Sequence, residues 1–382
     1  MTQKQVQTVL LDGDPAAPQQ ARLGAALALR GLHVVVLDAP RVAKQIREEF
    51  GQTCQEIRGI PRYLGAVSRF LIQRAAKKLQ VDVVHLNYLT PRQRLWADER
   101  HGPPYVATAW GSDLNREVFQ FSAGHEAALD VILQHASAVT ADSQPLLEKA
   151  QKRMGHNPSP AELVYWSADL QQFDPQKARA QAQLFRQQLE IAPDQKVLLS
   201  PRQPRPHYHI EHIVTGFAQS DWAKNGVLVL KSHGKPGEDG YINQLLAQAK
   251  SLGVADRVRL APHMNYDELA GFYAMADAAV SMPAADGVPS TFLELMALEV
   301  PIVATDLPAY VGVVPHNERG LLVPVGDPQA LTAALNRLLH EPDLARTLTR
   351  NARTWALEHA DWQRSVDRWL ELYAQAIQTA RP

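Results

Sequence analysis

The chain contains little cysteine, no long apolar run and no excess of either charge. Cys54 is the one cysteine among 382 residues, which excludes an intrachain disulfide framework and favours a reducing compartment. Lys and Arg total 39 against 40 Asp and Glu, so bulk charge does not indicate nucleic-acid binding. The sequence has no run of about 18 apolar residues, as a membrane span requires, and its first residues lack the apolar core of a signal peptide. We therefore expect a cytoplasmic protein.

Length and composition indicate a globular protein with more than one core. A chain of 382 residues favours two domains, and 46% hydrophobic with 21% charged residues excludes extended disorder. Short apolar runs alternate with helical patterns in both halves of the chain, as βαβ units do. The expected strands are 6–11, 33–37, 81–86, 105–108 and 138–140, then 197–200, 227–231, 257–260, 278–281 and 301–304.

This rhythm predicts an α/β protein with two Rossmann-like, doubly wound domains facing a cleft. Regular structure breaks between Trp166 and Lys196, which places the domain boundary there. We expect a first domain over 1–175, a second over 176–360, and a final amphipathic helix within 361–382 that begins after Asp361.

The segment 281–306 carries two carboxylates across a loop-to-helix turn, Asp286 and Glu294. Ser290 is a plausible helix N-cap, so the helix is expected to begin near Thr291 with free amides that favour an anion such as a diphosphate. Glu294 could then bind a ribose diol, and Asp286 the hydroxyls of a sugar beyond the phosphates. The local pattern alone fits an ordinary capped surface helix equally well.

The stretch Asp286-Gly287-Val288-Pro289-Ser290-Thr291-Phe292-Leu293-Glu294 and its continuation to Pro301 resemble the nucleotide-sugar site of retaining GT-B glycosyltransferases, especially family 4. That motif has two glutamates separated by seven residues, and a Gly shortly before a Pro. Here Asp286 stands for the first glutamate and Glu299 for the Gly. Residues 266–278 and 317–331 also resemble the family. The resemblance implies that Gly287, Val288, Ser290 and Thr291 contact the donor, and that the helix in 361–379 crosses back to the first domain.

The resemblance also implies a phosphate-binding loop at the start of the second domain. Ser200-Pro201-Arg202 is similar to the family's Gly-Arg loop, so Arg202 is the expected diphosphate ligand. The Lys that the family places a few residues later has no clear equivalent, and Arg205 or His207 could replace it. His263 and Met264 stand where the family contacts the nucleotide base through backbone atoms.

The first domain resembles the family more weakly. Asp82–Tyr88 is similar to the family's Asp-Val-Val-His strand end, and Thr108–Leu114 to its His-Gly-Ser-Asp segment. Trp110 replaces the His that touches the donor sugar, and an indole can stack on a sugar but cannot act as an acid or base. Asp113 is the expected acceptor or donor contact, with helix capping as the alternative. His85 is expected either to contact the sugar or to be structural, and Gly13 could allow a donor phosphate to approach the backbone.

Together these features predict a hexosyltransferase-type, retaining glycosyltransferase that uses a nucleotide-sugar, a UDP-sugar by preference, with Asp286, Arg202 and Asp113 in catalysis. No cofactor or metal is expected: His207, His209 and His212 cluster in the sequence, but we find no acidic partner set for them. A catalytically impaired partner subunit that binds a glycan or nucleotide remains open, as does a nucleotide-sugar epimerase, although the acid–base residues of an epimerase are missing.

The acceptor is left undefined by the sequence and could be a glycan, a lipid or a small molecule. Residues 62–79 combine Arg62, Arg69, Arg74, Lys77 and Lys78 with an apolar stripe, so this segment could lie on the anionic inner face of a membrane. The alternative is a sheet-packing helix with a charged outer face.

Overall fold

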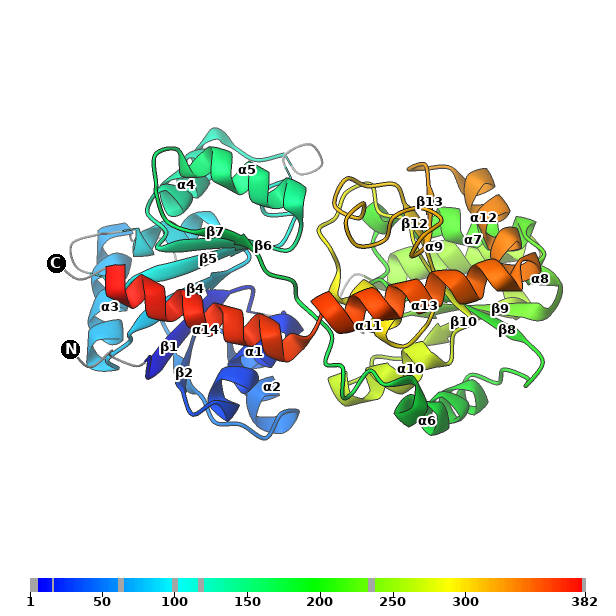
Figure 1. The fold of residues 1–382 in the computed structure, drawn as a ribbon, viewed down its shortest axis with the longest axis horizontal. Helices are drawn as coiled ribbons and strands as arrows, with labels where there is room; N and C mark the ends of the chain where they lie inside the picture. Colours follow the sequence, from blue (N-terminus) through cyan, green and yellow to red (C-terminus); the bar gives the residue numbers. More distant parts are fainter. Residues whose placement is uncertain are drawn as a thin grey trace. The chain divides into compact units, whose positions relative to one another are not determined.

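The protein consists of two compact units, each built on one parallel sheet (Figure 1). The computed structural model describes residues 6–15, 17–60, 65–97, 102–115, 120–232 and 238–379. Unit 1 spans residues 1–166 and 363–382, and unit 2 spans 167–362. The chain thus changes unit after Trp166, where the sequence placed the change after residue 175, and it returns to unit 1 after Trp362.

The described part of unit 1 holds a seven-stranded sheet in the order β3-β2-β1-β4-β5-β6-β7, with every neighbouring pair parallel. The central strands are apolar runs buried on both faces, as parallel sheets require. The strands are β1 Thr8–Gly13, β2 His33–Leu37, β3 Gln55–Ile57, β4 Val83–Asn87, β5 Tyr105–Ala109, β6 Ala138–Ala141 and β7 Ala161–Leu163. The helices are α1 Pro18–Leu29, α2 Pro40–Glu48, α3 Gly65–Lys78, η1 Pro91–Trp96 (3₁₀), α4 Ala123–Gln134 and α5 Gln144–Met154.

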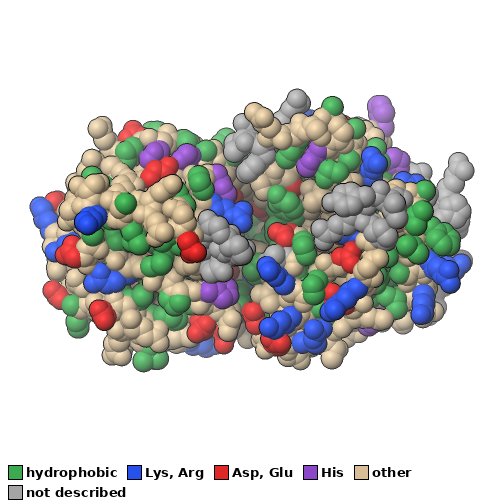
Figure 2. Space-filling model, turned by 180° about the vertical axis from the view of Figure 1, so that it is seen from behind, with side chains coloured by type: hydrophobic (Ala, Val, Ile, Leu, Met, Phe, Trp, Pro, Cys, Tyr) green, Lys and Arg blue, Asp and Glu red, His purple; other side chains and the backbone are tan. Residues whose placement is uncertain are grey.

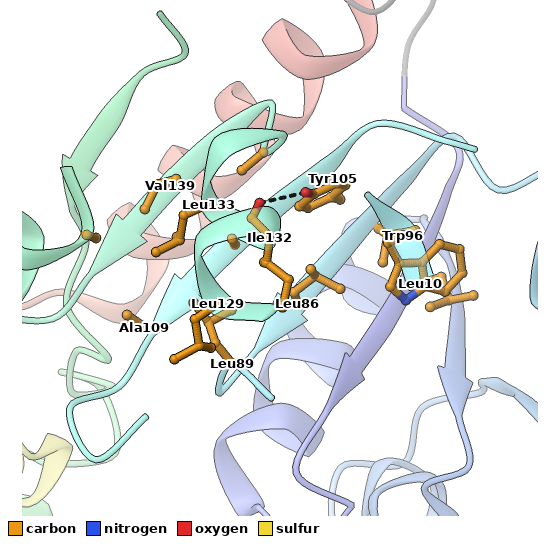
Figure 3. Packing of buried hydrophobic residues seen from close by; sticks show 14 of the residues in the cluster. Leu10, Leu86, Leu89, Trp96, Tyr105, Ala109, Leu129, Ile132, Leu133 and Val139 are labelled. Atoms are coloured by element: carbon orange, nitrogen blue, oxygen red, sulfur yellow. Dashed lines mark hydrogen bonds between the residues drawn. The ribbon is translucent and has the colours of Figure 1, made fainter. Parts of the chain in front are cut away.

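The core of unit 1 forms between this sheet and its helices. Figure 3 shows Leu129, Ile132 and Leu133 of α4 facing side chains of the strands, and the Tyr105 hydroxyl donating to the Ile132 carbonyl at 2.6 Å. The buried phenol therefore has a hydrogen-bond acceptor within the core, as a polar group without access to water requires.

Helix α14, Trp362–Thr379, belongs to unit 1 although the whole of unit 2 precedes it in the chain. Val366, Trp369, Leu372 and Tyr373 on this helix are fully buried. The Trp369 ring lies 4.8 Å from that of Trp166, and Arg368 pairs with Glu162 of β7. The returning helix is therefore a structural part of unit 1, as the sequence resemblance implied.

The described part of unit 2 holds a six-stranded parallel sheet in the order β10-β9-β8-β11-β12-β13. The strands are β8 Lys196–Ser200, β9 Gly226–Lys231, β10 Val258–Ala261, β11 Ala278–Ser281, β12 Ile302–Thr305 and β13 Leu321–Val323. The helices are α6 Pro175–Gln188, α7 Ile210–Gln219, α8 Trp222–Asn225, α9 Glu238–Ser251, α10 Leu269–Ala274, α11 Ser290–Ala297, α12 Pro328–His340 and α13 Pro342–His359, with 3₁₀ turns η2 Pro206–Tyr208, η3 Ala255–Arg257 and η4 Tyr266–Glu268.

The surface of the protein mixes both signs of charge. Across the face drawn in Figure 2, Lys and Arg side chains are interspersed with Asp and Glu, in keeping with the formal net charge of −1. Among the described helices, none combines the length and apolarity needed to cross a bilayer.

Glu299, two residues after α11, adopts a left-handed backbone with φ +60°. A residue with a Cβ is strained in this region, whereas Gly is not. The conformation explains why a Gly is the natural residue at this turn between α11 and β12. The Glu299 carboxylate lies 3.4 Å from Arg353 of α13, so the side chain gains an ion pair in exchange for the strained backbone.

Candidate functional site

Charged side chains gather at the carboxyl ends of the unit 2 strands. Arg202 follows β8 by two residues, and Asp286 lies in the loop after β11. Strands β8 and β11 are neighbours from which the sheet extends in opposite directions, so this is the topological switch point. Open α/β sheets bind their ligands at this place, outside the carboxyl ends of the strands.

Arg202 and Asp286 form the centre of this site. Arg202 Nη2 lies 2.8 Å from Asp286 Oδ2, and the two side chains are 12% and 17% exposed. Arg202 Nη2 also donates to the Tyr208 hydroxyl at 2.7 Å, and the Tyr310 hydroxyl donates to Asp286 Oδ2 at 3.0 Å. The Gly287 amide donates to Asp286 Oδ1 at 3.1 Å. The sequence predicted the ion pair's two members but neither tyrosine.

Electrostatics make the two members of the ion pair depend on each other. Burial raises the pKa of Asp286, whereas the nearby Arg202 guanidinium lowers it. Burial disfavours the charged form of Arg202, but attraction to Asp286 and interactions with Tyr208 and Tyr310 outweigh it and raise its pKa. The site therefore holds a fixed guanidinium charge in a poorly solvated place, where it acts strongly on a nearby anion.

Helix α11 begins beside this pair, but not as expected. Ser290 is the first residue of the helix, and Pro289 occupies the N-cap position without a side-chain cap. The expectation of a Ser290 cap is therefore wrong, since the preceding proline already fixes the extended backbone that a cap residue needs. The first turn has no side-chain cap, and the anion site that the sequence places at its amides stays a prediction. Val288, before the helix, is buried, while Ser290 and Thr291 are half-buried.

Glu294 lies one turn into α11 and is only 3% exposed. The Thr291 hydroxyl, on the preceding turn, forms a hydrogen bond with Tyr273 of α10. A carboxylate this deeply buried needs polar partners to stay ionised. The Glu294 carboxylate offers acceptor oxygens, as binding a diol requires, and its expected role at the ribose stays a prediction.

The other residues expected at the donor differ in accessibility. Arg205 is exposed, and burial lowers the pKa of half-buried His207 to about 4, which leaves it neutral at pH 7. His263 is exposed and Met264 is buried. A further cation, Lys231 at the end of β9, is buried in the same unit and was not singled out from the sequence. In the sequence, the feature that marks Lys231 is its position as the charged residue directly after the apolar run Val227–Leu230.

The residues expected to act in unit 1 are held by the fold. His85 is fully buried, with Nδ1 2.5 Å from the Tyr373 hydroxyl of α14 and Nε2 2.6 Å from Thr108 Oγ1. Burial lowers the pKa of His85 to about 3, so the ring is neutral. Both ring nitrogens of His85 have partners within unit 1. These contacts favour a structural role for His85, one of the two roles that the sequence left open.

Asp113 organises the loop after β5. Its carboxylate accepts from the amides of Leu89 at 2.9 Å, Trp110 at 3.0 Å and Gly111 at 2.9 Å, and the side chain is 2% exposed. Burial raises the pKa of Asp113 to about 6 against the effect of these amides. The Asp113 carboxylate ties the ends of β4 and β5 together, and its expected role in catalysis stays a prediction.

Trp110 and Gly13 stand at two other strand ends of unit 1. The Trp110 ring packs edge-on against Trp166 at 4.9 Å and Tyr88 at 6.0 Å, and it remains partly exposed. A Cβ on Gly13 would overlap the Asn87 carbonyl and the Gln20 side chain, so only Gly fits between β1, β4 and α1. Close packing therefore explains this glycine without a phosphate.

A cavity of about 730 Å³ opens at the switch point of unit 1, between the ends of β1 and β4. Arg92 and Arg94 of η1 line one part of it, and Arg92 pairs with Asp38 at 2.8 Å. The remaining lining residues are Asp12, Gly13, Asp14, Pro15, Gly65, Tyr88, Thr90, Pro91 and Leu95.

The histidines at the start of α7 do have an acidic neighbour, contrary to the sequence analysis. His209, Glu211 and His212 bring their ligand atoms within 4.8 Å of one another. Glu211 accepts from His209 Nδ1 at 3.1 Å and from the Tyr241 hydroxyl, and the two imidazoles stack at 5.2 Å. Parallel stacking and these hydrogen bonds account for the cluster without a metal ion.

Comparison with known proteins agrees with this architecture. Residues 181–355 match the family described as Glycosyl transferases group 1, and residues 13–143 match Glycosyl transferase 4-like. D-inositol 3-phosphate glycosyltransferase of Salinispora arenicola is 28% identical over 369 residues, covering 92% of this chain and 80% of that protein.

Solved structures share the fold. HepE from Anabaena, crystallised with UDP and glucose, has a TM-score of 0.80 at 19% identity and covers 96% of this chain and 98% of its own. Sucrose-phosphate synthase from Thermosynechococcus elongatus has a TM-score of 0.80 at 22% identity, covering 98% and 100%. These neighbours are GT-B glycosyltransferases, and the family matches fall on both units. The chain therefore belongs to the group 1 glycosyltransferases and has the GT-B fold.

Proposed function

We propose that this protein transfers a hexose from a UDP-sugar to an acceptor hydroxyl with retention of configuration, and needs no metal ion. The observation that carries the proposal is the half-buried Arg202–Asp286 pair beside the uncapped first turn of α11. HepE, a structural neighbour, was crystallised with UDP-glucose, which supports uracil as the base. The retaining outcome rests on the family resemblance of the segment 281–306.

The proposed division of labour follows the chemistry of each side chain. Arg202 and the amides at Ser290 and Thr291 bind the diphosphate and stabilise its charge as the bond to the anomeric carbon breaks. The bonding electrons pass to the diphosphate oxygen, the acceptor oxygen bonds to the anomeric carbon, and its proton passes to the departing diphosphate. Glu294 accepts from the ribose hydroxyls, and Asp286 accepts from hydroxyls of the transferred sugar.

Two substitutions separate these roles. Glu294→Ala should weaken UDP binding on the order of 10–100-fold, because a carboxylate that accepts hydrogen bonds is lost. Asp286→Ala should keep UDP affinity within a few-fold but abolish transfer. Calorimetry with UDP and a transfer assay measure both. Unchanged transfer by both variants would refute the assignment of the site.

A first experiment decides between an enzyme and an inactive binding partner. Thermal stabilisation by UDP, GDP and ADP should favour UDP, since a ligand that binds only the folded state raises its stability. The alternative of an impaired partner subunit is favoured by Trp110, which cannot transfer protons. Wild-type protein that shows neither nucleotide binding at millimolar concentration nor donor hydrolysis would support that alternative.

We place the acceptor in the cavity of unit 1 and infer that it is a phosphorylated polyol. Arg94 is exposed at this cavity and forms no salt bridge within the described part of the chain, so it is available to an anion. Several relatives are named D-inositol 3-phosphate glycosyltransferases, which supports this acceptor class. Arg94→Ala should lower transfer to inositol phosphate and leave transfer to inositol unchanged, as product mass spectrometry would measure. Equal rates with both acceptors in wild type would contradict it.

Contact with a membrane is the last part of the proposal. On α3, Val67 is 51% and Phe70 60% exposed, and Arg74, Lys77 and Lys78 are exposed without an acidic residue on the helix. Residues 62–64 of the expected segment lie outside the described residues. Such a face suits an anionic lipid surface. Sedimentation with phosphatidylglycerol vesicles, absent with phosphatidylcholine and reduced by Phe70→Ser, is the expected result.

A further inference from the structure

Lys231 is a buried cation at the carboxyl end of β9, the strand next to β8. The residue is 6% exposed, although lysine is almost never this buried unless its charge is paired. Leu230, just before it, is in register with Ser200 of β8, two residues before Arg202. The fold therefore brings Lys231 to the same edge of the sheet as the Arg202–Asp286 pair.

The hydrogen-bond partner of Lys231 is a neutral group. Its ammonium Nζ lies 3.2 Å from the Tyr273 hydroxyl of α10, and it forms no salt bridge within the described part of the chain. Burial lowers the pKa of Lys231 to about 8, with attraction to Glu294 and repulsion from Arg202 also acting on it. A buried ammonium without an adjacent carboxylate is costly for the fold, and such groups concentrate at functional sites.

The contacts of Tyr273 connect this ammonium to the helix start. The Tyr273 hydroxyl also forms a hydrogen bond with Thr291, the second residue of α11. Lys231 is thus one side chain away from the first turn of α11, and its charge is attracted by Glu294 and repelled by Arg202.

Neither residue expected to supply a second cation is suited to that role. Arg205 is exposed to solvent, where a charge is strongly screened. His207 is neutral at pH 7 because burial lowers its pKa to about 4. Lys231 is the remaining candidate whose charge would act in a poorly solvated place.

We propose that Lys231 is a diphosphate ligand of the donor site, supplying together with Arg202 the positive charge that binds the nucleoside diphosphate. The inference rests on the proposed function, since it assigns a further residue to the same donor. A bound diphosphate would place an anion against the Lys231 ammonium, in addition to the attraction that Glu294 already exerts on it.

The competing explanation is that Lys231 only positions Glu294 for the ribose. A comparison of UDP with uridine separates the two, because uridine keeps the ribose and lacks the phosphates. Lys231→Met retains the length of the side chain and removes its charge. We expect this variant to bind UDP on the order of 10–100-fold more weakly and to bind uridine as wild type does. Calorimetry measures both affinities.

Lys224→Met is the matched control, since Lys224 is 78% exposed and pairs with Asp221 at the surface. It should leave both affinities unchanged. The melting temperature of Lys231→Met without ligand should equal or exceed that of wild type, because a costly buried charge is removed. If Lys231→Met does not fold, Lys231→Gln takes its place in the same comparison.

Each outcome decides the proposal. An equal loss of UDP and uridine affinity would show that Lys231 acts by positioning Glu294 at the ribose. That result would overturn the diphosphate role. Unchanged affinity for UDP would overturn it as well. Wild-type protein that binds neither UDP nor uridine would instead overturn the proposed function, which is distinguishable because the failure precedes any substitution.

Discussion

Polar side chains stand at the carboxyl ends of parallel strands in both units, but they are used differently. In unit 2, Arg202 and Asp286 pair with each other and remain partly exposed, next to amides and a buried ammonium. In unit 1, His85 and Asp113 are buried, with their polar atoms bonded to the fold itself. The comparison teaches that a polar residue at a strand end is a candidate for ligand binding only where the fold itself does not use all of its hydrogen bonds or its charge.

The difference has a physical origin in what covers each strand end. Helix α14 places Tyr373 directly on His85, so the unit 1 histidine becomes part of a core. At the corresponding edge of unit 2 lies the start of α11, whose first turn has no side-chain cap and presents backbone amides. Substitutions should therefore change chemistry in unit 2 and stability in unit 1.

The largest effect is expected from Arg202→Ala. Loss of the guanidinium should reduce kcat on the order of 10²–10³-fold, because charge on the departing diphosphate loses its fixed partner. It also removes the group that lowers the pKa of Asp286. Transfer assays at saturating UDP-sugar measure the effect. Arg205→Ala, at an exposed position of the same loop, is the control. A comparable loss of kcat in this variant would show that the effect is not specific to Arg202.

The next largest effect is the pH dependence of the stability of unit 1. The pKa of His85 is lowered to about 3, below its unfolded value of 6.5, so unfolding takes up a proton as the pH falls through that range. The stability due to the neutral ring is present above pH 6.5 and is lost progressively below it, by about 2 kcal/mol at pH 5. Urea unfolding between pH 7 and 5 measures this slope.

His85→Gln should flatten that slope and lower stability at pH 7, while kcat of the folded enzyme stays within a few-fold of wild type. His33→Gln, at an exposed position, should leave the slope unchanged. A large loss of kcat in His85→Gln at full folding would show that unit 1 also contributes this side chain to the reaction.

The smallest effect concerns the turn after α11. Glu299→Gly should be about 1 kcal/mol more stable than Glu299→Ala, because both lose the Arg353 pair and only Gly relieves the positive φ. Thermal or urea unfolding of the two variants gives the difference directly. Equal stability would mean that the strain at Glu299 is absorbed elsewhere in the turn.

The sequence predicted the central strands of both sheets well and missed three of the four edge strands. Strands β3, β7 and β13 were not foreseen; each has three residues and lies at the end of a sheet. An edge strand is covered on fewer sides, so its apolar signal is weak: no residue of β7 is fully buried. The buried central strands, by contrast, appear in the sequence as continuous apolar runs, so they were predicted.

The site was predictable where it is local and was missed where it is not. Asp286, Glu294 and the start of α11 lie within one short segment, so their spacing carries the information. Lys231, Tyr273 and Tyr310 reach the same edge from a strand, a helix and a turn that are distant in the sequence. Only the fold brings these residues together. Glu211 is an exception, because it lies between His209 and His212 in the sequence itself and was overlooked there.

The return of α14 to unit 1 has a consequence for the order of folding during synthesis. A ribosome makes the seven strands of unit 1 first, then all of unit 2, and only then the helix that carries Trp369 and Tyr373 into the first core. Domains generally fold as units in the order in which they emerge. Unit 2 can therefore finish folding before unit 1 does. Until α14 is synthesised and packs, His85 and Trp166 of unit 1 remain uncovered.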